Sequence, residues 1–419
     1  MTQVEMPGEG ERVEVLVGAV AHGGHCVARV GGDGGPVLFV RHALPGERVI
    51  ALVTEVHRGF ARADAVEILT PSADRVTAPC VYAHPNRCGG CDLQHVAPAA
   101  QLAWKTSVVT EQLARLGKLT QDQIQALGVR VAPLDGDGLG WRTRVRYAVD
   151  GRHSAGLLKH RSHEVVPVDR CLIAHPSIQA APVTSESWPD ADEVHVVASG
   201  GGDVLVTPRR SPLRLDEPDI LDGASVAGEI REKAVGREWV LPGDAFWQVH
   251  PAAADTLAAA VLELLVPRPG EAAWDLYGGA GLFAAALAGM VGPTGPVTVV
   301  ESAPQGVAAA RRNLTDLPGV AVIGARVEAA LRQGRLPKPV DLIVLDPPRS
   351  GAGAAVVKAI TRTGARAVAY VACDPAAFAR DVATFRAAGW RLAELRAFDL
   401  FPMTHHVECV GLLLPPATR

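Results

Sequence analysis

The sequence lacks any long apolar run: no stretch approaches the roughly 18 consecutive apolar residues that a membrane-spanning helix needs. Its first residues, Met1 to Glu11, are polar and acidic, without the basic and apolar segments of a secretory signal peptide. We therefore expect a cytoplasmic protein with no membrane contact. Thiols stay reduced in that compartment, so clustered cysteines more often bind metal or carry out chemistry than form disulfides.

An excess of basic residues is also missing, since the formal net charge is -4, with 41 Lys and Arg against 45 Asp and Glu. Proteins that bind RNA through its phosphates usually carry a basic excess, so an RNA partner would require local concentrations of positive charge. Repeats and low-complexity tracts are absent as well. With 48% hydrophobic residues over 419 positions, the composition is that of an ordinary globular protein of two or three domains.

Three regions with different patterns divide the chain, and we expect one domain from each. Residues 10–70 alternate short apolar runs with glycine-rich turns, which is typical of a small all-β barrel. Residues 75–240 begin with a cysteine-rich loop and a helix near residues 94–118, and they continue as a mainly β region. Residues 241–419 alternate apolar strands with alanine-rich helices, which predicts βαβ units, a mostly parallel sheet and the α/β fold class.

The first candidate site is a glycine turn in the last region. A predicted strand runs into Tyr277 and the glycine-rich residues 278–281, and a helix follows. Glycines in such a βα turn let a nucleotide cofactor approach the backbone closely. The next predicted strand, residues 297–300, leads to Glu301, where an acidic side chain is placed to bind ribose hydroxyls. The two features together indicate a cofactor that contains adenosine.

Two other strands of this region end in a reactive side chain followed by proline. Asp346 precedes Pro347 and Pro348, and Cys373 stands two residues before Pro375. Proline cannot continue a strand, so both side chains are expected at the carboxyl edge of the sheet, where open α/β sheets bind ligands. A thiolate of Cys373 at that edge could be an activated nucleophile.

Glu408 stands at the start of the last apolar strand, between Val407 and Cys409. Apolar flanks would partly desolvate its carboxyl group, which raises a carboxyl pKa toward the range that suits a general base. The alternative is a glutamate on an edge strand that faces solvent. Cys409, like Cys26, has the setting of a buried core cysteine.

Three cysteines, Cys80, Cys88 and Cys91, lie within twelve residues in a loop that also contains glycine and proline. This spacing predicts a metal site. A fourth ligand is needed, and Cys171 is the best remaining candidate. Four thiolates suit both zinc and an iron-sulfur cluster, so the spacing leaves the metal open.

A local concentration of positive charge follows this loop. Arg142, Arg144 and Arg146 alternate along one predicted strand, which would place them on the same face of a sheet. Such a face could bind RNA phosphates, although a solvated strand face is the alternative.

The order of six motifs closely resembles the RNA uridine-5-methyltransferase family, in particular its members with an N-terminal TRAM domain and a [4Fe-4S] cluster. The likeness extends over nearly the whole chain. The motifs are CGGCDLQH at residues 88–95, FWQVH at 246–250, DLYGGAGLF at 275–283, DPPRSG at 346–351, YVACDPAAFARD at 370–381 and FPMTHHVE at 401–408.

The resemblance implies a class I methyltransferase domain that transfers a methyl group from S-adenosylmethionine to C5 of a uridine in tRNA or rRNA. Cys373 would be the nucleophile that adds to C6 of the base, and Glu408 would remove the proton from C5. The cofactor and uracil site would be lined by Gln248, Tyr277, Glu301 and Asp346. The metal would be a [4Fe-4S] cluster held by Cys80, Cys88, Cys91 and Cys171.

The same resemblance implies that the N-terminal barrel is a TRAM-like RNA-binding domain and that the helix near residues 101–118 packs back on the catalytic domain. We expect a monomer with no obligate protein partner. The sequence departs from the family pattern in its glycine turn, where Gly278, Ala280 and Leu282 replace the cysteine and asparagines of many members. It also has Asp374 after the nucleophile, where asparagine is common, and a longer first cysteine gap.

Three other functions are compatible with parts of this pattern. A cytosine-5 RNA methyltransferase also uses a cysteine nucleophile, but the likeness places a single catalytic cysteine after its strand and a glutamate base near the C-terminus. An amino-group methyltransferase would need no such cysteine. An iron-sulfur protein that binds RNA without catalysis would need neither Cys373 nor Glu408.

Overall fold

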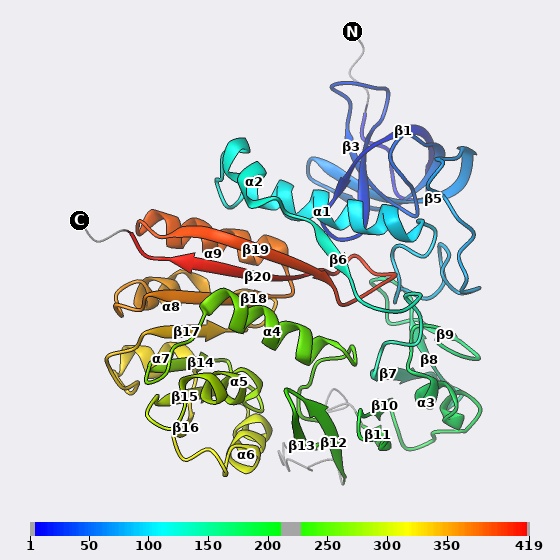
Figure 1. Cartoon of the computed structure of the whole chain (residues 1–419). Coiled ribbons are helices and arrows are strands. Elements are labelled where there is room, and N and C mark those ends of the chain that lie inside the picture. Colours follow the sequence, from blue (N-terminus) through cyan, green and yellow to red (C-terminus); the bar gives the residue numbers. More distant parts are fainter. Residues whose placement is uncertain (1–4, 211–227, 417–419) are drawn as a thin grey trace.

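The computed structural model of the chain describes residues 5–210 and 228–416. A small barrel, a central β region and a large sheet with helices on both faces follow one another along the chain (Figure 1). Residues 211–227 of the predicted central region and residues 417–419 of the predicted last region lie outside the described residues. Of the helices in the described ranges, none combines the length and the apolar character that crossing a membrane requires.

Five strands near the N-terminus close into a barrel in the order β1-β2-β3-β5-β4. They are β1 (Arg12–Ala21), β2 (His25–Arg29), β3 (Val37–Arg41), β4 (Arg48–His57) and β5 (Phe60–Thr70). Alternate side chains such as Val15, Leu38 and Val49 fill the interior, as the period of two along a strand requires. Cys26 is fully buried among them. The predicted small all-β barrel with a core cysteine is confirmed.

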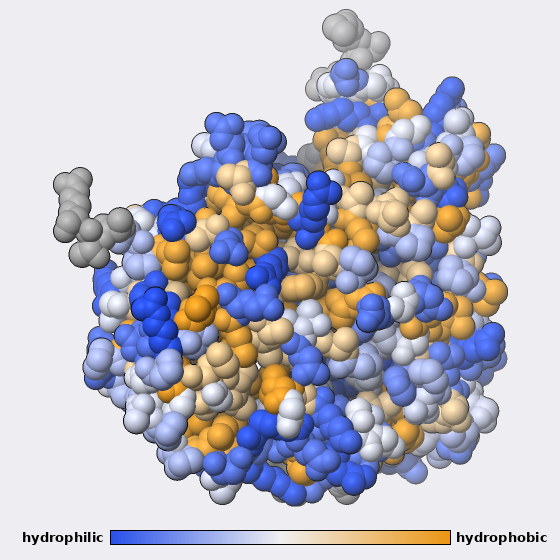
Figure 2. Space-filling view, viewed as in Figure 1, coloured by the Kyte–Doolittle hydropathy of each residue, from blue (hydrophilic) through white to orange (hydrophobic). Residues whose placement is uncertain are grey.

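Helix α1 (Pro98–Arg115) joins the barrel to the large sheet, and α2 (Gln121–Leu127) follows it. In Figure 1, α1 lies between the barrel and the C-terminal strands. Trp104 and Val108 pack into the barrel core, whereas Val109 and Leu113 pack into the core beneath the sheet. This helix therefore fixes the position of the barrel relative to the sheet. Figure 2 shows hydrophilic side chains over α2, whose outer residues are exposed.

The large sheet has eight strands in the order β16-β15-β14-β17-β18-β20-β19-β6. Seven come from the C-terminal region: β14 (Ala273–Leu276), β15 (Val297–Glu301), β16 (Val320–Gly324), β17 (Leu342–Leu345), β18 (Ala367–Ala372), β19 (Arg391–Asp399) and β20 (Glu408–Leu414). Strands β14 to β18 are parallel, and β20 runs antiparallel to both β18 and β19. The eighth strand, β6 (Val131–Pro133), pairs with β19 from outside the region where the sheet was predicted.

Helices cover both faces of this sheet, as an α/β fold requires. One face packs against α4 (Ala253–Leu265), α5 (Leu282–Val291) and α6 (Pro304–Asn313). The other packs against α7 (Val327–Arg332), α8 (Gly353–Ile360) and α9 (Pro375–Ala387), together with α1. The central strands β14, β15, β17 and β18 are short and buried on both faces, so each forms a continuous, mostly apolar run in the sequence.

The central region is mainly β in the part that the structure describes. A five-stranded sheet has the order β11-β10-β7-β8-β9, and β12 and β13 form a separate hairpin. The bounds are β7 (Arg144–Val149), β8 (Ala155–Leu158), β9 (Val165–Pro167), β10 (Glu193–Ala198), β11 (Val204–Arg209), β12 (Glu229–Ala234) and β13 (Arg237–Pro242), with the helix α3 (Pro176–Gln179) and the 3₁₀ turn η1 (Pro182–Thr184).

Candidate functional site

A cleft of about 1130 Å³ opens at the carboxyl ends of the parallel strands of the large sheet. All six residues predicted for catalysis and cofactor binding line this cleft: Gln248, Tyr277, Glu301, Asp346, Cys373 and Glu408. They come from segments that are far apart in the sequence. Strand ends meet at this edge because five strands run parallel, and ligands of open α/β sheets bind at such an edge.

The glycine turn after β14 forms one wall of the cleft. Tyr277 has a φ of 61°, and Gly278 has no room for a side chain, because an added Cβ would lie 2.6 Å from Val299 Cγ1. The backbone N–H of Gly279 donates to Glu301 Oε2 at 2.9 Å. Glu301 therefore ties the turn to the end of β15 while its carboxylate lines the cleft.

Three carboxyl groups with raised pKa values concentrate at this edge, the buried Asp275 and Glu408 and the partly buried Asp346. Asp275 lies beneath the turn and accepts a hydrogen bond from the Ala284 N–H at 2.9 Å, and its burial raises its pKa to about 8. Burial raises the pKa of Asp346 as well. The pKa of Glu408 is raised by burial first and then by repulsion from Asp346. This is the direction expected for Glu408 from its apolar flanks, and it means that the site favours protonated carboxyl groups.

Cys373 and Glu408 are neighbours across two antiparallel strands. Ala372 at the end of β18 pairs with Cys409 of β20. Cys373 follows Ala372 and Glu408 precedes Cys409, so the two residues flank the last pair of this ladder, and Glu408 lies close enough to raise the pKa of Cys373 by repulsion. Both side chains line the cleft. A thiol and a carboxyl group therefore lie side by side at the mouth of the sheet.

The surroundings do not activate the thiol of the free protein. Burial, followed by repulsion from Glu408 and Asp346, raises the pKa of Cys373 to about 12. Arg349 acts in the opposite direction but does not outweigh them. The sulfur therefore carries its proton near neutral pH, and a thiolate requires further positive charge in the cleft.

The loop before Glu408, residues 400–407, is held by side chains from the N-terminal half. Lys105 of α1 donates to Phe401 O at 3.1 Å and pairs with Asp399 Oδ1 at 2.5 Å. Gln101 Oε1 accepts from the Met403 N–H at 3.1 Å. The loop that leads to the predicted base thus depends on α1 for its shape.

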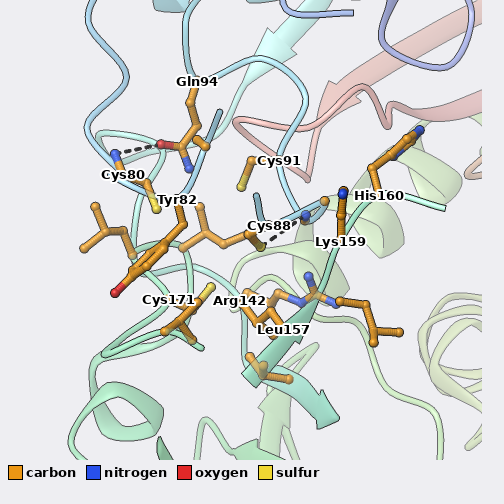
Figure 3. Close-up of a pocket in the computed structure, with 18 of the residues that line it drawn as sticks. Cys80, Tyr82, Cys88, Cys91, Gln94, Arg142, Leu157, Lys159, His160 and Cys171 are labelled. Atoms are coloured by element: carbon orange, nitrogen blue, oxygen red, sulfur yellow. Dashed lines mark hydrogen bonds between the residues drawn. The ribbon is translucent and has the colours of Figure 1, made fainter. Parts of the chain in front are cut away.

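The four predicted metal ligands line one cavity of about 290 Å³ beside the cleft: Cys80, Cys88, Cys91 and Cys171. Figure 3 shows their sulfur atoms pointing into this cavity, with Arg142 and Lys159 at its side. Among the described residues, however, no three or more His, Cys, Asp or Glu side chains form a group that could hold a metal ion. The fold brings the four cysteines around one space, but the predicted metal cluster is not shown.

Of the three arginines expected on one phosphate-binding face, the structure leaves only one largely free, and whether the face binds phosphates stays a prediction. Arg144 on β7 is only 16% exposed and donates to the carbonyl oxygens of Gly243 and Ala245, at 3.4 and 3.1 Å. Arg142 precedes β7, and its Nε donates to Arg144 O at 3.0 Å. Only Arg146 of the three has a largely exposed side chain, at 67%. The segment before α4 covers Arg144, which local alternation could not reveal.

Sequence reasoning missed several residues of the cleft. Arg349 and His406 line it and lie 3.5 Å apart, and Trp141 and Phe401 add aromatic rings whose centroids are 6.0 Å apart. Arg349 lies within the DPPRSG motif, so its charge beside Asp346 was an available signal. Lys105, outside the cleft, was also missed. A lysine on the apolar face of a predicted helix indicates a buried acidic partner, which here is Asp399.

Comparison with known proteins adds two family matches. Residues 8–66 match the TRAM domain family, and residues 337–416 match the tRNA (uracil-5-)-methyltransferase family. The first match coincides with the closed barrel. The second spans the strands β17, β18, β19 and β20 and includes Asp346, Cys373 and Glu408.

Relatives are similar over their whole length. An uncharacterized RNA methyltransferase of Streptomyces avermitilis is 50% identical, over 97% of this chain and 99% of the relative. One from Streptomyces coelicolor is 49% identical, over 97% and 94%. The crystal structure of Pyrococcus abyssi tRNA (uracil-54, C5)-methyltransferase in complex with S-adenosyl-L-homocysteine has a TM-score of 0.70 and 22% identity, over 95% of this chain and 99% of that one. At that identity the structural likeness shows a shared fold.

Proposed function

This chain belongs to the RNA methyltransferases of the tRNA (uracil-5-)-methyltransferase family, and from that membership we propose that it methylates C5 of a specific uridine in tRNA or rRNA through a covalent adduct between Cys373 and C6. S-adenosylmethionine is the proposed methyl donor, and it brings a positive sulfonium group into the cleft. The observation that carries the proposal is that a cysteine and a buried glutamate, at the ends of β18 and β20, line the same cleft.

The first step makes a carbon nucleophile. C5 of uracil is too weakly nucleophilic to attack a methyl sulfonium, so the Cys373 sulfur adds to C6 and the electron pair of the C5–C6 double bond moves onto C5 and O4 as an enolate. The thiol first loses its proton to solvent, and this loss is the electrostatic obstacle, because burial and two carboxyl groups raise the pKa of Cys373 to about 12. Arg349 supports ionisation, and the positive charge of the bound donor adds to it.

The second half of the reaction restores the aromatic base. C5 of the adduct forms a bond to the methyl group, whose bond to sulfur breaks, and C5 then carries both a methyl group and a hydrogen. Glu408 accepts that proton, the double bond re-forms, and the Cys373 thiolate leaves. The raised pKa of Glu408 makes its carboxylate a stronger proton acceptor than an exposed one.

The remaining residues of the cleft have proposed binding roles. Glu301 carries carboxylate oxygens at the end of β15, where ribose hydroxyls of an adenosine donor would lie, and Tyr277 lies in the adjoining turn. Asp346 and Gln248 are proposed to hold the donor and the uracil. The target base must leave its stack to reach the edge of the sheet, which favours a nucleotide in a loop or one that is flipped out.

We further propose that Cys80, Cys88, Cys91 and Cys171 hold a [4Fe-4S] cluster. In support, their four sulfur atoms point into one cavity, which Arg142 and Lys159 also line. Cationic neighbours suit the negative charge of a cluster with four thiolate ligands. The cluster would tie the loop at residues 80–91 to residue 171, and the cysteines would thereby support folding or RNA binding. Methyl transfer itself exchanges no electrons.

Mass-spectrometric mapping of 5-methyluridine tests the function. RNA from cells with and without the protein, and from cells with Cys373→Ala, should differ by one 5-methyluridine that only the wild-type protein restores. The same map distinguishes the alternatives, because 5-methylcytidine or a methylated amino group at the affected position would replace the proposed reaction by another.

A further inference from the structure

One turn of the N-terminal barrel reaches the catalytic loops. The turn at residues 22–24 joins β1 to β2, and His22 Nε2 lies 3.1 Å from Asp374 Oδ2. Asp374 is the residue that follows Cys373. Two positions further in the turn, Gly24 packs so closely that an added Cβ would lie 2.7 Å from Cβ of Asp92. The turn is therefore seated between the loop of the proposed nucleophile and the loop that contains Asp92.

Asp374, next to the proposed nucleophile, caps a helix and contacts the barrel. Its Oδ1 accepts a hydrogen bond from the Ala377 N–H at 2.7 Å, which caps the N-terminus of α9, and its Oδ2 faces His22. Burial alone would raise the pKa of Asp374, but the hydrogen bonds from His22 and Ala377 outweigh burial and lower it. Cys373 is thus held on one side by the end of β18 and on the other by a carboxylate that the barrel contacts.

The barrel also reaches the loop that leads to Glu408. Arg41 of β3 donates to Asp92 Oδ1 at 3.3 Å, and Asp92 Oδ2 lies 2.5 Å from His405 Nδ1. The rings of His22 and His405 meet edge to face, with centroids 6.3 Å apart. The loop after Cys373 therefore contacts the barrel directly, and the loop before Glu408 contacts Asp92, which the barrel holds.

We propose that His22 is a positioning residue for methyl transfer: through Asp374, the turn of the barrel sets the place of the Cys373 sulfur, so the barrel takes part in catalysis as well as in RNA binding. The inference rests on the proposed roles of Cys373 and Glu408. Here the residue after the nucleophile is an aspartate, and its carboxylate lets a histidine of another domain hold it by an ion pair or a hydrogen bond.

The test compares His22→Ala and His22→Gln in the full-length protein. RNA that carries 5-fluorouridine at the target position stops the reaction after adduct formation, because no base can remove fluorine as a cation. The rate of adduct formation under single turnover then reports nucleophile placement. His22→Ala should lower this rate, and kcat with it, by about tenfold or more, since small misplacements of a reacting group cost up to about 100-fold. KM for RNA and the thermal midpoint should stay near the wild-type values.

His22→Gln should restore most of the rate, because its amide N–H can donate to Asp374. The matched control is His57→Ala, which removes another barrel histidine that contacts Glu55 at 3.1 Å within the barrel; it should leave the rate of adduct formation unchanged. A higher KM for RNA with an unchanged adduct rate in His22→Ala would overturn the inference and leave the barrel a binding domain. Absence of any adduct in the wild-type protein would instead overturn the proposed function.

Discussion

Replacement of Glu408 by glutamine separates the two halves of the proposed reaction. Glutamine keeps the size of a side chain that is only 3% exposed, but it cannot accept a proton. Glutamine carries no charge, so it adds no repulsion against a Cys373 thiolate. Removal of the C5 proton should become about 100- to 10,000-fold slower, which is the usual contribution of a general base. The methylated adduct should therefore accumulate.

Denaturing electrophoresis after incubation with RNA and S-adenosylmethionine measures this accumulation as protein that stays attached to RNA. The adduct should contain the transferred methyl group, and it should disappear when Cys373→Ala is added to the same protein. Glu263→Gln is a matched control, because Glu263 is an exposed glutamate that pairs with Arg396 on the surface. Wild-type turnover by Glu408→Gln, or an adduct without the methyl group, would refute the reasoning.

Three further changes test other parts of the structure. Lys105→Met leaves the buried carboxylate of Asp399 unpaired, so urea denaturation should show a free energy of unfolding lower by about 3–5 kcal/mol; Arg115→Met, in the exposed pair of the same helix, should cost less than about 1 kcal/mol, and equal losses would contradict the account. Burial raises the pKa of Asp275 to about 8, so the stability that its protonated form provides is complete below its unfolded pKa of about 4 and is lost as the pH rises through about 8. Asp275→Asn should flatten that fall in calorimetry, and an unchanged slope would argue against a buried acid. Cys171→Ser should lower the iron content and visible absorbance of anaerobically purified protein, whereas a colourless wild-type protein that contains zinc would contradict an iron-sulfur cluster.

The residues at the carboxyl edge of the large sheet were predictable because the sequence features that mark them are local. Proline after Asp346 and after Cys373 ends each strand, and the glycine turn at residues 278–281 follows its strand directly. Parallel strands then bring these ends together without further information. The barrel was likewise predictable from alternating apolar residues and glycine turns. Cys26 and Cys409 lie in apolar sequence and are buried in the core, as predicted.

Contacts between segments that are distant in the sequence could not be predicted from local patterns. Cys373 and Glu408 lie in one cleft because β20 inserts between β18 and β19 and runs antiparallel to β18. Arg144 looked like part of a free cationic face, but the segment at residues 243–245 covers it. The contact between His22 and Asp374 joins residues of two domains, and no spacing within either domain indicates it.

The most direct test of the central proposal is peptide mapping of the adduct that the wild-type protein forms with 5-fluorouridine RNA and S-adenosylmethionine. Tandem mass spectrometry should place a methylated fluorouracil nucleotide on the sulfur of Cys373. Attachment to another residue, or steady methylation of uridine by protein whose Cys373 has been replaced by alanine, would contradict it.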